Sequence, residues 1–216
     1  QDNGRFKKED VIPPIICPMR HTSNDITFEE MNLWIIDERL AYHLFLASDK
    51  TIKSLPEVDS SSTKEVDLAV FDRAFAYTDD DSPLNTITIV EFKKPDNKRD
   101  NPISQMGGYI DEITHGHKKR ANGLSFGDCS KTAFRCYAVC DLTPRMIRHC
   151  RDAGLRITPD GMGYYGYQPE RNAYFEVISY PKLLADAKKR NRILFDKLFE
   201  AKPGEVIHIL DVKEAK

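Results

Sequence analysis

The sequence has no excess of charge of one sign, no closely paired cysteines and no long apolar run. Its 32 basic and 34 acidic residues leave a net charge of −2, so no overall field favours a polyanionic partner. The five cysteines form no CxxC pair, which favours free thiols in a reducing compartment over disulfides. No stretch approaches the roughly 20 apolar residues of a membrane helix and no secretory leader is recognisable, so we expect a cytoplasmic protein without a membrane partner.

The length and composition predict one main domain. A chain of 216 residues with 40% apolar content is long enough for one substantial core. It begins with Gln1 in a polar stretch, from which we expect a fragment of a longer polypeptide. The prolines of "VIPPIICP" disfavour helix, so residues 1–26 are predicted to be an extended arm lying along a surface or edge. Residues 27–216 are predicted to form the single domain.

A first helix is predicted from Thr27 toward Ser48. Thr27 is a suitable N-cap, and Glu30 follows three residues later, as in a capping box. Apolar residues then recur at helical spacing, namely Leu33, Ile36, Leu40 and Leu44.

Two strands and a second helix are predicted next. "VDLAVFDRAFAY" and "NTITIVEFKKP" have the composition of strands, and the polar turn between them predicts a hairpin or meander. Asn101 followed by Pro102 predicts a helix start, and "ISQMGGYIDEITHG" supplies the helix. Its Gly107 and Gly108 each cost about 1 kcal/mol of helix propensity, which indicates a close approach to that face.

The remainder predicts a strand at 131–143, a short helix ending at Gly154, a hairpin at 163–180 and a closing amphipathic helix. The apolar side of that last helix is assigned to Leu184, Ala187, Leu194 and Leu198. The element order therefore predicts a mixed α/β domain around a central sheet flanked by helices, with an added C-terminal hairpin and helix.

A possible reactive centre lies at the end of the strand over residues 85–95. Residues two apart in a strand share a face, so Glu91 and Lys93 point the same way. The preceding strand places Asp67 between apolar residues, where a carboxylate is costly unless it binds a cation or a donor. Two carboxylates and an amine make a site for a hard divalent ion, a chemistry suited to phosphodiester hydrolysis.

Asp67 followed by Glu91-Phe92-Lys93 resembles the D…(D/E)xK pattern of the PD-(D/E)xK nuclease superfamily, with Val66 in place of the proline that names it. Gln105 and Tyr109 on the next helix resemble the QxxxY motif of the RecB-like branch. The resemblance implies a restriction-endonuclease-like core, composed of a helix, a three-stranded meander, a helix and a further strand over roughly residues 27–142.

The resemblance also implies a metal-dependent nuclease acting on nucleic acid, with DNA as the expected partner. Asp67 and Glu91 would hold one or two Mg²⁺ or Mn²⁺ ions together with the backbone carbonyl of Phe92. Glu38 is the candidate for a further ligand from the first helix, with Glu30 and Asp37 as alternatives. The implied catalytic residues are Asp67, Glu91, Lys93, Gln105 and Tyr109.

Basic residues near this centre are candidate nucleic-acid contacts. They are Lys94, Lys98, Arg99, Lys118, Lys119 and Arg120. The segment "WIIDERLAYH" with this core also resembles nuclease domains at the C-terminal end of bacterial GHKL-type ATPases of phage defence, which implies an ATPase domain of the same polypeptide as a partner and an antiviral role.

Two alternatives stay open at this stage. One is a catalytically idle module on the same scaffold that binds nucleic acid or a partner domain, and the other is an unrelated α/β protein with a chance motif. The cysteines at 136, 140 and 150 are predicted to be buried thiols and not zinc ligands. Tyr164, Tyr165 and Tyr167 are predicted to pack in the hairpin and not to stack on bases.

Overall fold

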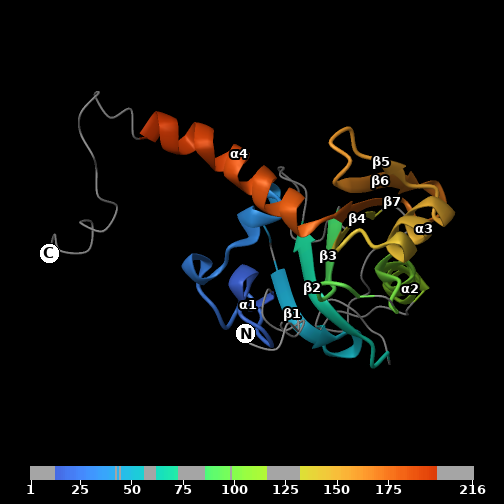
Figure 1. Ribbon diagram of the computed structural model, residues 1–216. Helices are drawn as coiled ribbons and strands as arrows, with labels where there is room; N and C mark the ends of the chain where they lie inside the picture. Colours follow the sequence, from blue (N-terminus) through green and yellow to red (C-terminus); the bar gives the residue numbers. More distant parts are fainter. Residues whose placement is uncertain are drawn as a thin grey trace, which may run out of the picture.

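The protein is built around one mixed sheet of seven strands. The computed structural model describes residues 13–41, 43, 45–55, 62–72, 86–97, 99–115 and 132–198. The strands lie in the order β1-β2-β3-β4-β7-β6-β5 (Figure 1). Their bounds are Phe45–Thr51 (β1), Glu65–Asp72 (β2), Thr86–Phe92 (β3), Ala133–Val139 (β4), Arg156–Ile157 (β5), Gly163–Gln168 (β6) and Ala173–Ile178 (β7).

The sheet consists of an antiparallel meander, a parallel centre and an antiparallel hairpin. β1, β2 and β3 pair antiparallel, and β3, β4 and β7 pair parallel. β7 then pairs antiparallel with β6, and β6 with β5. The helices are α1 (Pro13–Ile16), α2 (Pro102–His115), α3 (Pro144–Asp152) and α4 (Tyr180–Leu198). The predicted mixed α/β domain with a C-terminal hairpin and helix is therefore confirmed.

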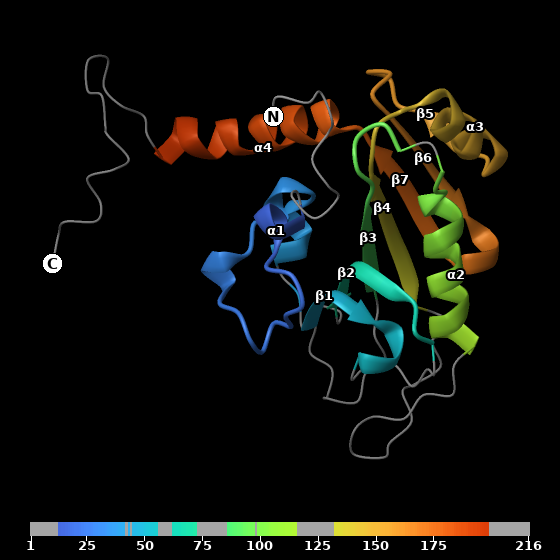
Figure 2. The ribbon, with the colours of Figure 1, turned by 60° about the horizontal axis from the view of Figure 1, so that its bottom comes forward.

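The two faces of the sheet are covered by different parts of the chain. α2 and α3 lie on one face, and the N-terminal segment with the start of α4 lies on the other (Figures 1 and 2). On the α2 face, Ile87 and Ile89 of β3 pack with Met106 and Ile110 of α2. On the opposite face, Val90 and Phe92 pack with residues of the N-terminal segment. β3 is covered on both sides, which explains why apolar residues occur on both of its faces.

The helix predicted after β3 forms as expected. Asn101 accepts a hydrogen bond from the Ser104 amide through Oδ1 at 3.2 Å, and Pro102 occupies the first turn, where its missing N–H costs nothing. α2 then carries the chain from the end of β3 back to the start of β4, which is the crossover that a parallel pair of strands requires.

The prediction of one helix from Thr27 to Ser48 is wrong. Three short 3₁₀ turns occupy Phe28–Glu30, Leu33–Ile35 and Glu38–Ala41, and β1 begins at Phe45. Glu30 does accept from the amide of Thr27, at 2.8 Å, but the turn that it caps ends at once. The apolar residues with helical spacing are buried nonetheless, because successive 3₁₀ turns bring Leu33, Ile36 and Leu40 onto one face of the sheet.

The prediction of an extended N-terminal arm is wrong for Pro13–Ile16, which form one turn of helix with both prolines in its first two positions, where they are tolerated. Residues after this turn lie along the edge of β1, as predicted, with an isolated bridge between Thr22 and Ala47. Residues 1–12 of the predicted arm lie outside the described part of the chain.

The apolar side of α4 differs from the predicted one. Leu183 is 4% exposed and packs in the cluster below the helix, whereas Leu184 is 59% exposed. Ala187 is buried, as predicted. Side chains at 194 and 198 lie outside the described set. None of the helices in the described ranges has the length and apolar character needed to cross a membrane.

Candidate active site

Asp67 on β2 and Glu91 on β3 project toward α2. The two strands pair Ala69 with Ile89, and both of these residues belong to the core cluster that α2 covers. Asp67 and Glu91 lie two residues further toward the same end of this strand pair, so they share that face. Oδ2 of Asp67 accepts a hydrogen bond from the Phe92 amide at 2.7 Å, which ties the carboxylate of one strand to the backbone of the other.

Glu91 is a fully buried carboxylate with an incomplete hydrogen-bond shell. Oε2 accepts from Nζ of Lys93 at 3.0 Å, and Lys93 is itself only 8% exposed. Among the described residues, no donor meets hydrogen-bond geometry to Oε1 of Glu91. The nearby Tyr109 hydroxyl lowers the pKa of this carboxyl, but it directs its single proton to the carbonyl of Glu65. A buried carboxylate oxygen left without a donor or a cation is costly. Glu91 and Lys93 therefore share a strand face, as the sequence pattern predicts, and their side chains are in direct contact.

The pKa of the Glu91 carboxyl is raised to about 8. Burial is the main cause, and the negative charge of Asp67 adds to it. Lys93 and the Tyr109 hydroxyl lower this pKa, but their effect does not offset burial and the charge of Asp67. A cation bound between Asp67 and Glu91 would lower the pKa of both carboxyls, because its positive charge would favour their ionised form.

The backbone of Lys93 is held at two points just beyond the end of β3. Its amide donates to the carbonyl oxygen of Val139 on β4 at 2.9 Å. Its carbonyl oxygen accepts from the hydroxyl of Tyr180 in the first turn of α4. These bonds fix the position from which the Lys93 side chain reaches Glu91, so the ion pair is built on a rigid part of the fold.

Gln105 and Tyr109 lie beside this pair on α2. Nε2 of Gln105 donates to the Tyr109 hydroxyl one helical turn away. The hydroxyl in turn donates its single proton to the backbone carbonyl of Glu65, at the start of β2, at 2.6 Å. It lies close enough to Glu91 for the carboxylate to raise the pKa of Tyr109, in addition to the effect of burial. The structure thus brings together all five predicted catalytic residues.

Comparisons with family models, curated proteins and solved structures find no match to this chain.

Glu38 is not part of this site. It lines a cavity of about 210 Å³ on the opposite face of the sheet, where its carboxylate is 3.4 Å from the guanidinium of Arg190 on α4. Asp37 lies in the same cavity and accepts from Arg39 and from the buried hydroxyl of Tyr137 at 2.7 Å. Burial alone would raise the pKa of Asp37, but these bonds lower it to about 2.

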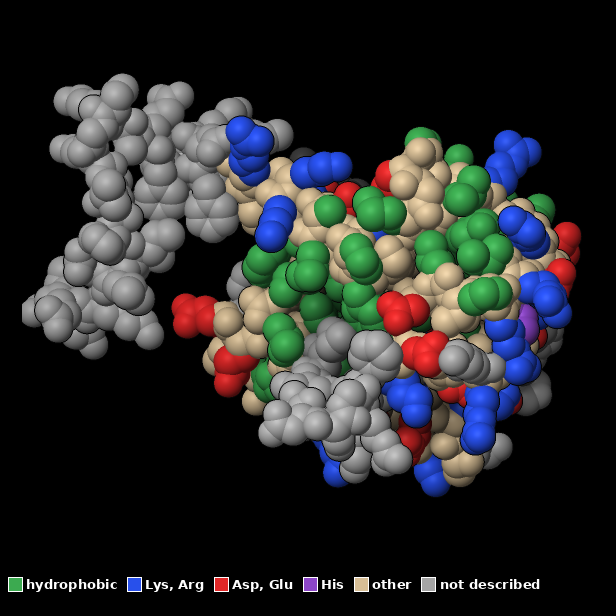
Figure 3. Space-filling model, viewed as in Figure 1, with side chains coloured by type: hydrophobic (Ala, Val, Ile, Leu, Met, Phe, Trp, Pro, Cys, Tyr) green, Lys and Arg blue, Asp and Glu red, His purple; other side chains and the backbone are tan. Residues whose placement is uncertain are grey.

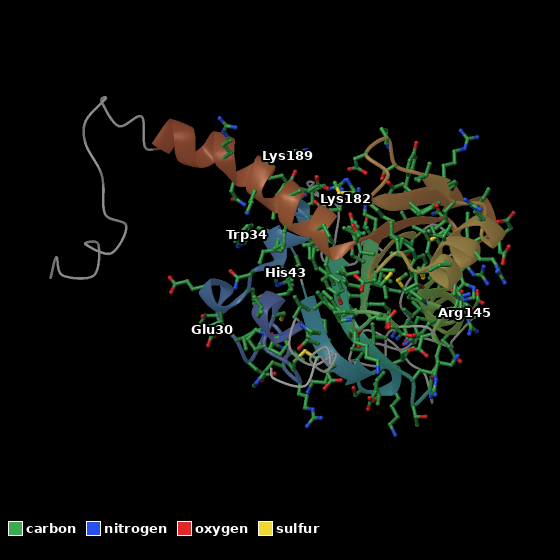
Figure 4. The ribbon with its side chains drawn as sticks, in the orientation of Figure 1. Glu30, Trp34, His43, Arg145, Lys182 and Lys189 are labelled. Carbon is green, nitrogen blue, oxygen red and sulfur yellow. The ribbon has the colours of Figure 1, made fainter. Side chains whose placement is uncertain are left out.

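Glu30 lies in the N-terminal segment, with Trp34, across the sheet from Arg145 of α3 (Figure 4). The described residues between 27 and 48 therefore place no third carboxylate beside Asp67 and Glu91, and the predicted ligand role of Glu38 is wrong. The cause is the missing first helix, because the turns that replace it cover the other face of the sheet.

Part of the predicted basic surface can be located. Lys94 and Arg99 are exposed in the segment between β3 and α2, directly after the ion pair. Lys98 and residues 118–120 lie outside the described ranges. On the face that Figure 3 shows, basic and acidic side chains are interspersed and do not separate into large areas of one sign. The basic residues on this face therefore do not form one extended basic surface.

A cavity of about 480 Å³ opens beside the QxxxY residues. It is lined by Lys64, Glu65, Ser104, Gln105, Gly108 and Tyr109. The sequence did not identify Lys64 or Ser104 as site residues. The only sequence feature that pointed to this cavity was the pair Gly107 and Gly108.

The prediction of buried thiols is confirmed for Cys136, Cys140 and Cys150. The prediction that three hairpin tyrosines pack is confirmed for Tyr164 and wrong for Tyr165 and Tyr167. The four cysteines in the described ranges are buried and free, and burial raises the pKa of each thiol. Tyr164 packs in the core, whereas Tyr165 and Tyr167 are exposed on the hairpin. Within the same ranges, no three His, Cys, Asp or Glu side chains are grouped to hold a metal ion.

Proposed function

We propose that this protein is a metal-dependent nuclease of the PD-(D/E)xK type that hydrolyses phosphodiester bonds of DNA. The observation that carries the proposal is the Glu91 carboxylate, which is fully buried, has one oxygen without a donor, shares a face with Asp67 and is paired with Lys93. Fold stability alone does not account for placing this group there, because an apolar residue would fill the position at lower cost.

The donor set fits Mg²⁺ or Mn²⁺. Mg²⁺ keeps several of its waters and is commonly held by one or two carboxylates, so Asp67 and Glu91 suffice without a third acid. The backbone carbonyl of Phe92, between Glu91 and Lys93, completes the proposed set. One or two ions bound here would lower the pKa of a bound water and stabilise charge on the phosphate oxygens.

Protein side chains provide the positioning and charge stabilisation that the reaction also needs. Lys93, which is held beside Glu91, would orient the attacking water and stabilise negative charge on the phosphate. Gln105 and Tyr109 position Lys93 and the substrate strand from α2. Lys94 and Arg99 contribute electrostatic contacts to the phosphate backbone.

The setting that fits this activity is a larger cytoplasmic protein of defence or DNA processing. The chain serves as its effector domain, and an ATPase domain of the same polypeptide is the proposed partner. Support for this part is confined to the resemblance of the "WIIDERLAYH" segment and the core that follows it.

The experiment is cleavage of labelled linear, supercoiled and single-stranded DNA in the presence of Mg²⁺, Mn²⁺ or EDTA. Wild type is compared with Glu91→Gln, which keeps the shape of the side chain but removes its charge. Glu170→Gln on the exposed turn between β6 and β7 is the matched control. We expect metal-dependent cleavage by wild type and the control and none by Glu91→Gln. A folded chain that binds DNA without cleaving it under any of these conditions would instead be an idle binding module.

A further inference from the structure

The two adjacent glycines of α2 have different structural explanations. A Cβ at Gly107 would lie 3.4 Å from Cζ of Arg171, whose guanidinium crosses the helix there to pair with Asp111 at 3.0 Å. A larger side chain at 107 would displace that ion pair. A Cβ at Gly108 would meet only Nζ of Lys64, at 3.6 Å, which is the mobile end of a long side chain. Packing in the described structure therefore does not require glycine at 108.

Gly108 instead leaves space in the cavity beside the candidate active site, because glycine has no side chain to fill it. It lines that cavity with Gln105 and Tyr109, which also belong to the catalytic set. Glycine in a helix interior costs about 1 kcal/mol relative to alanine, so its presence here has an energetic cost without a packing gain. The volume, about 480 Å³, lies within the range of roughly 300–1,000 Å³ that small-molecule sites occupy.

The lining combines polar side-chain groups with apolar surface, which suits a nucleotide better than a ligand that is apolar throughout. Ser104 is exposed at the rim, and Gln105 carries a side-chain amide with both donor and acceptor atoms. Lys64 is the basic group of the lining, and its Nζ lies 3.2 Å from Oε1 of Glu112. Two carboxylates, Glu65 and Glu112, thus stand near the rim, and they disfavour a ligand that consists only of phosphate.

We propose that this cavity binds one nucleotide of the substrate strand, next to the scissile phosphate. Its base and sugar lie against Gly108, Ser104 and Gln105, and Lys64 contacts the adjoining phosphate. This rests on the proposed nuclease function and adds a binding residue, Lys64, and a specificity-determining position, Gly108. A base can enter such a cavity only when it is out of a duplex stack, so the chain should favour single-stranded ends over intact duplex.

The test narrows the cavity without touching the metal-binding carboxylates. Gly108→Ala and Gly108→Leu place side chains of increasing size in it, and Gly107→Ala on the same helix is the matched control. Both alanine variants should raise Tm because helix propensity improves. We measure kcat and KM on a labelled single strand, together with binding of an oligonucleotide of about 12 nucleotides, followed by fluorescence anisotropy in EDTA.

We expect Gly108→Leu to raise KM, and the Kd of the single strand, by about tenfold or more with kcat changed by less than about twofold, because binding energy is lost equally in the ground and transition states. Gly108→Ala should lie between it and wild type, and Gly107→Ala should match wild type. Lys64→Ala should raise the Kd and reduce its dependence on salt.

The outcomes separate this proposal from the nuclease proposal. If wild type cleaves and Gly108→Leu, with an unchanged or higher Tm, cleaves and binds equally well, the cavity proposal is overturned and the nuclease stands. If wild type does not cleave but binds the single strand, and Gly108→Leu weakens that binding, the cavity is supported as a nucleotide site and the nuclease proposal fails. Absence of single-strand binding by wild type overturns the cavity proposal.

Discussion

Lys93 donates a hydrogen bond to Glu91 inside the protein, at 3.0 Å, with the carboxylate fully buried and the lysine nearly so. Such a pair is not in itself a device for stability, since removing two charges from water costs several kcal/mol per ion and the attraction between them offsets only part of that cost. Here the second carboxylate oxygen has no donor in the described structure, and Asp67 adds a negative charge on the same face. This arrangement supports the proposed cation site.

The first prediction concerns pH and the metal-free protein. The pKa of Glu91 is about 8 in the folded state against an ordinary value of 4.5. Between these values the folded state binds more protons than the unfolded state, so stability falls as pH rises through this window. The loss amounts to at most about 1.4 kcal/mol per pH unit.

Urea denaturation in EDTA from pH 5 to pH 9 measures this directly. Other groups titrate in the same range, so the comparison is with Glu91→Gln, which lacks this ionisation. As pH rises, wild type should lose stability relative to the variant, and the difference in their unfolding free energies should level off above about pH 8. A constant difference across the range would show that Glu91 has an ordinary pKa.

The second prediction separates Lys93 from its exposed neighbour. Lys93→Met keeps most of the apolar stem and removes the ammonium, so cleavage should fall below detection while the Kd for DNA changes by less than about threefold. Lys94→Met should instead weaken DNA binding and leave the cleavage step intact, because an exposed lysine contributes mainly long-range attraction to phosphate. The measurements are single-turnover cleavage and DNA binding over a range of salt. Equal cleavage by Lys93→Met and wild type would remove Lys93 from the catalytic set.

The third prediction tests which acids bind the metal. Asp67→Asn retains an oxygen that can accept from the Phe92 amide, so the strands stay joined, but the charge is lost. Its affinity for Mn²⁺, measured by calorimetry, should fall by about tenfold or more. Glu38→Gln should bind Mn²⁺ like wild type, because Glu38 faces Arg190 across the sheet. Reduced affinity in Glu38→Gln would mean that the N-terminal turns reach the site after all.

The site was largely predictable because its residues lie on elements with clear periodicity. Glu91 and Lys93 share a face whatever the partner strands are, and Gln105 and Tyr109 are one turn apart on a helix with strong start signals. β2 and β3 are consecutive strands, and their antiparallel pairing brings Asp67 to the same face. These local rules determine most of the geometry.

The fold of residues 27–51 was not predictable in the same way. Leu33, Ile36 and Leu40 are buried, as helical spacing predicts, but the burial is achieved by separate 3₁₀ turns. The backbone from Phe45 onward pairs with β2, and this long-range pairing overrides the local helical pattern. The predicted ligand role of Glu38 depended on that helix and is wrong for the same reason. Tertiary contacts determine which face of the sheet the segment covers. The cavity at Gly108 likewise depends on Lys64, which is distant in sequence.

The last prediction concerns the neighbouring leucines of α4, which are indistinguishable by local pattern. Either residue pairs with Ala187 at helical spacing, since Leu183 is four and Leu184 three residues before it. Packing against the sheet distinguishes them. Leu183 packs in the cluster with Ile178 and is 4% exposed, whereas Leu184 is 59% exposed. Leu183→Ala should therefore lower the unfolding free energy by about 2–4 kcal/mol, and Leu184→Ala should change it by less than about 0.5 kcal/mol. Urea denaturation of the two variants makes the comparison, and equal effects would mean that α4 is rotated about its axis relative to the described packing.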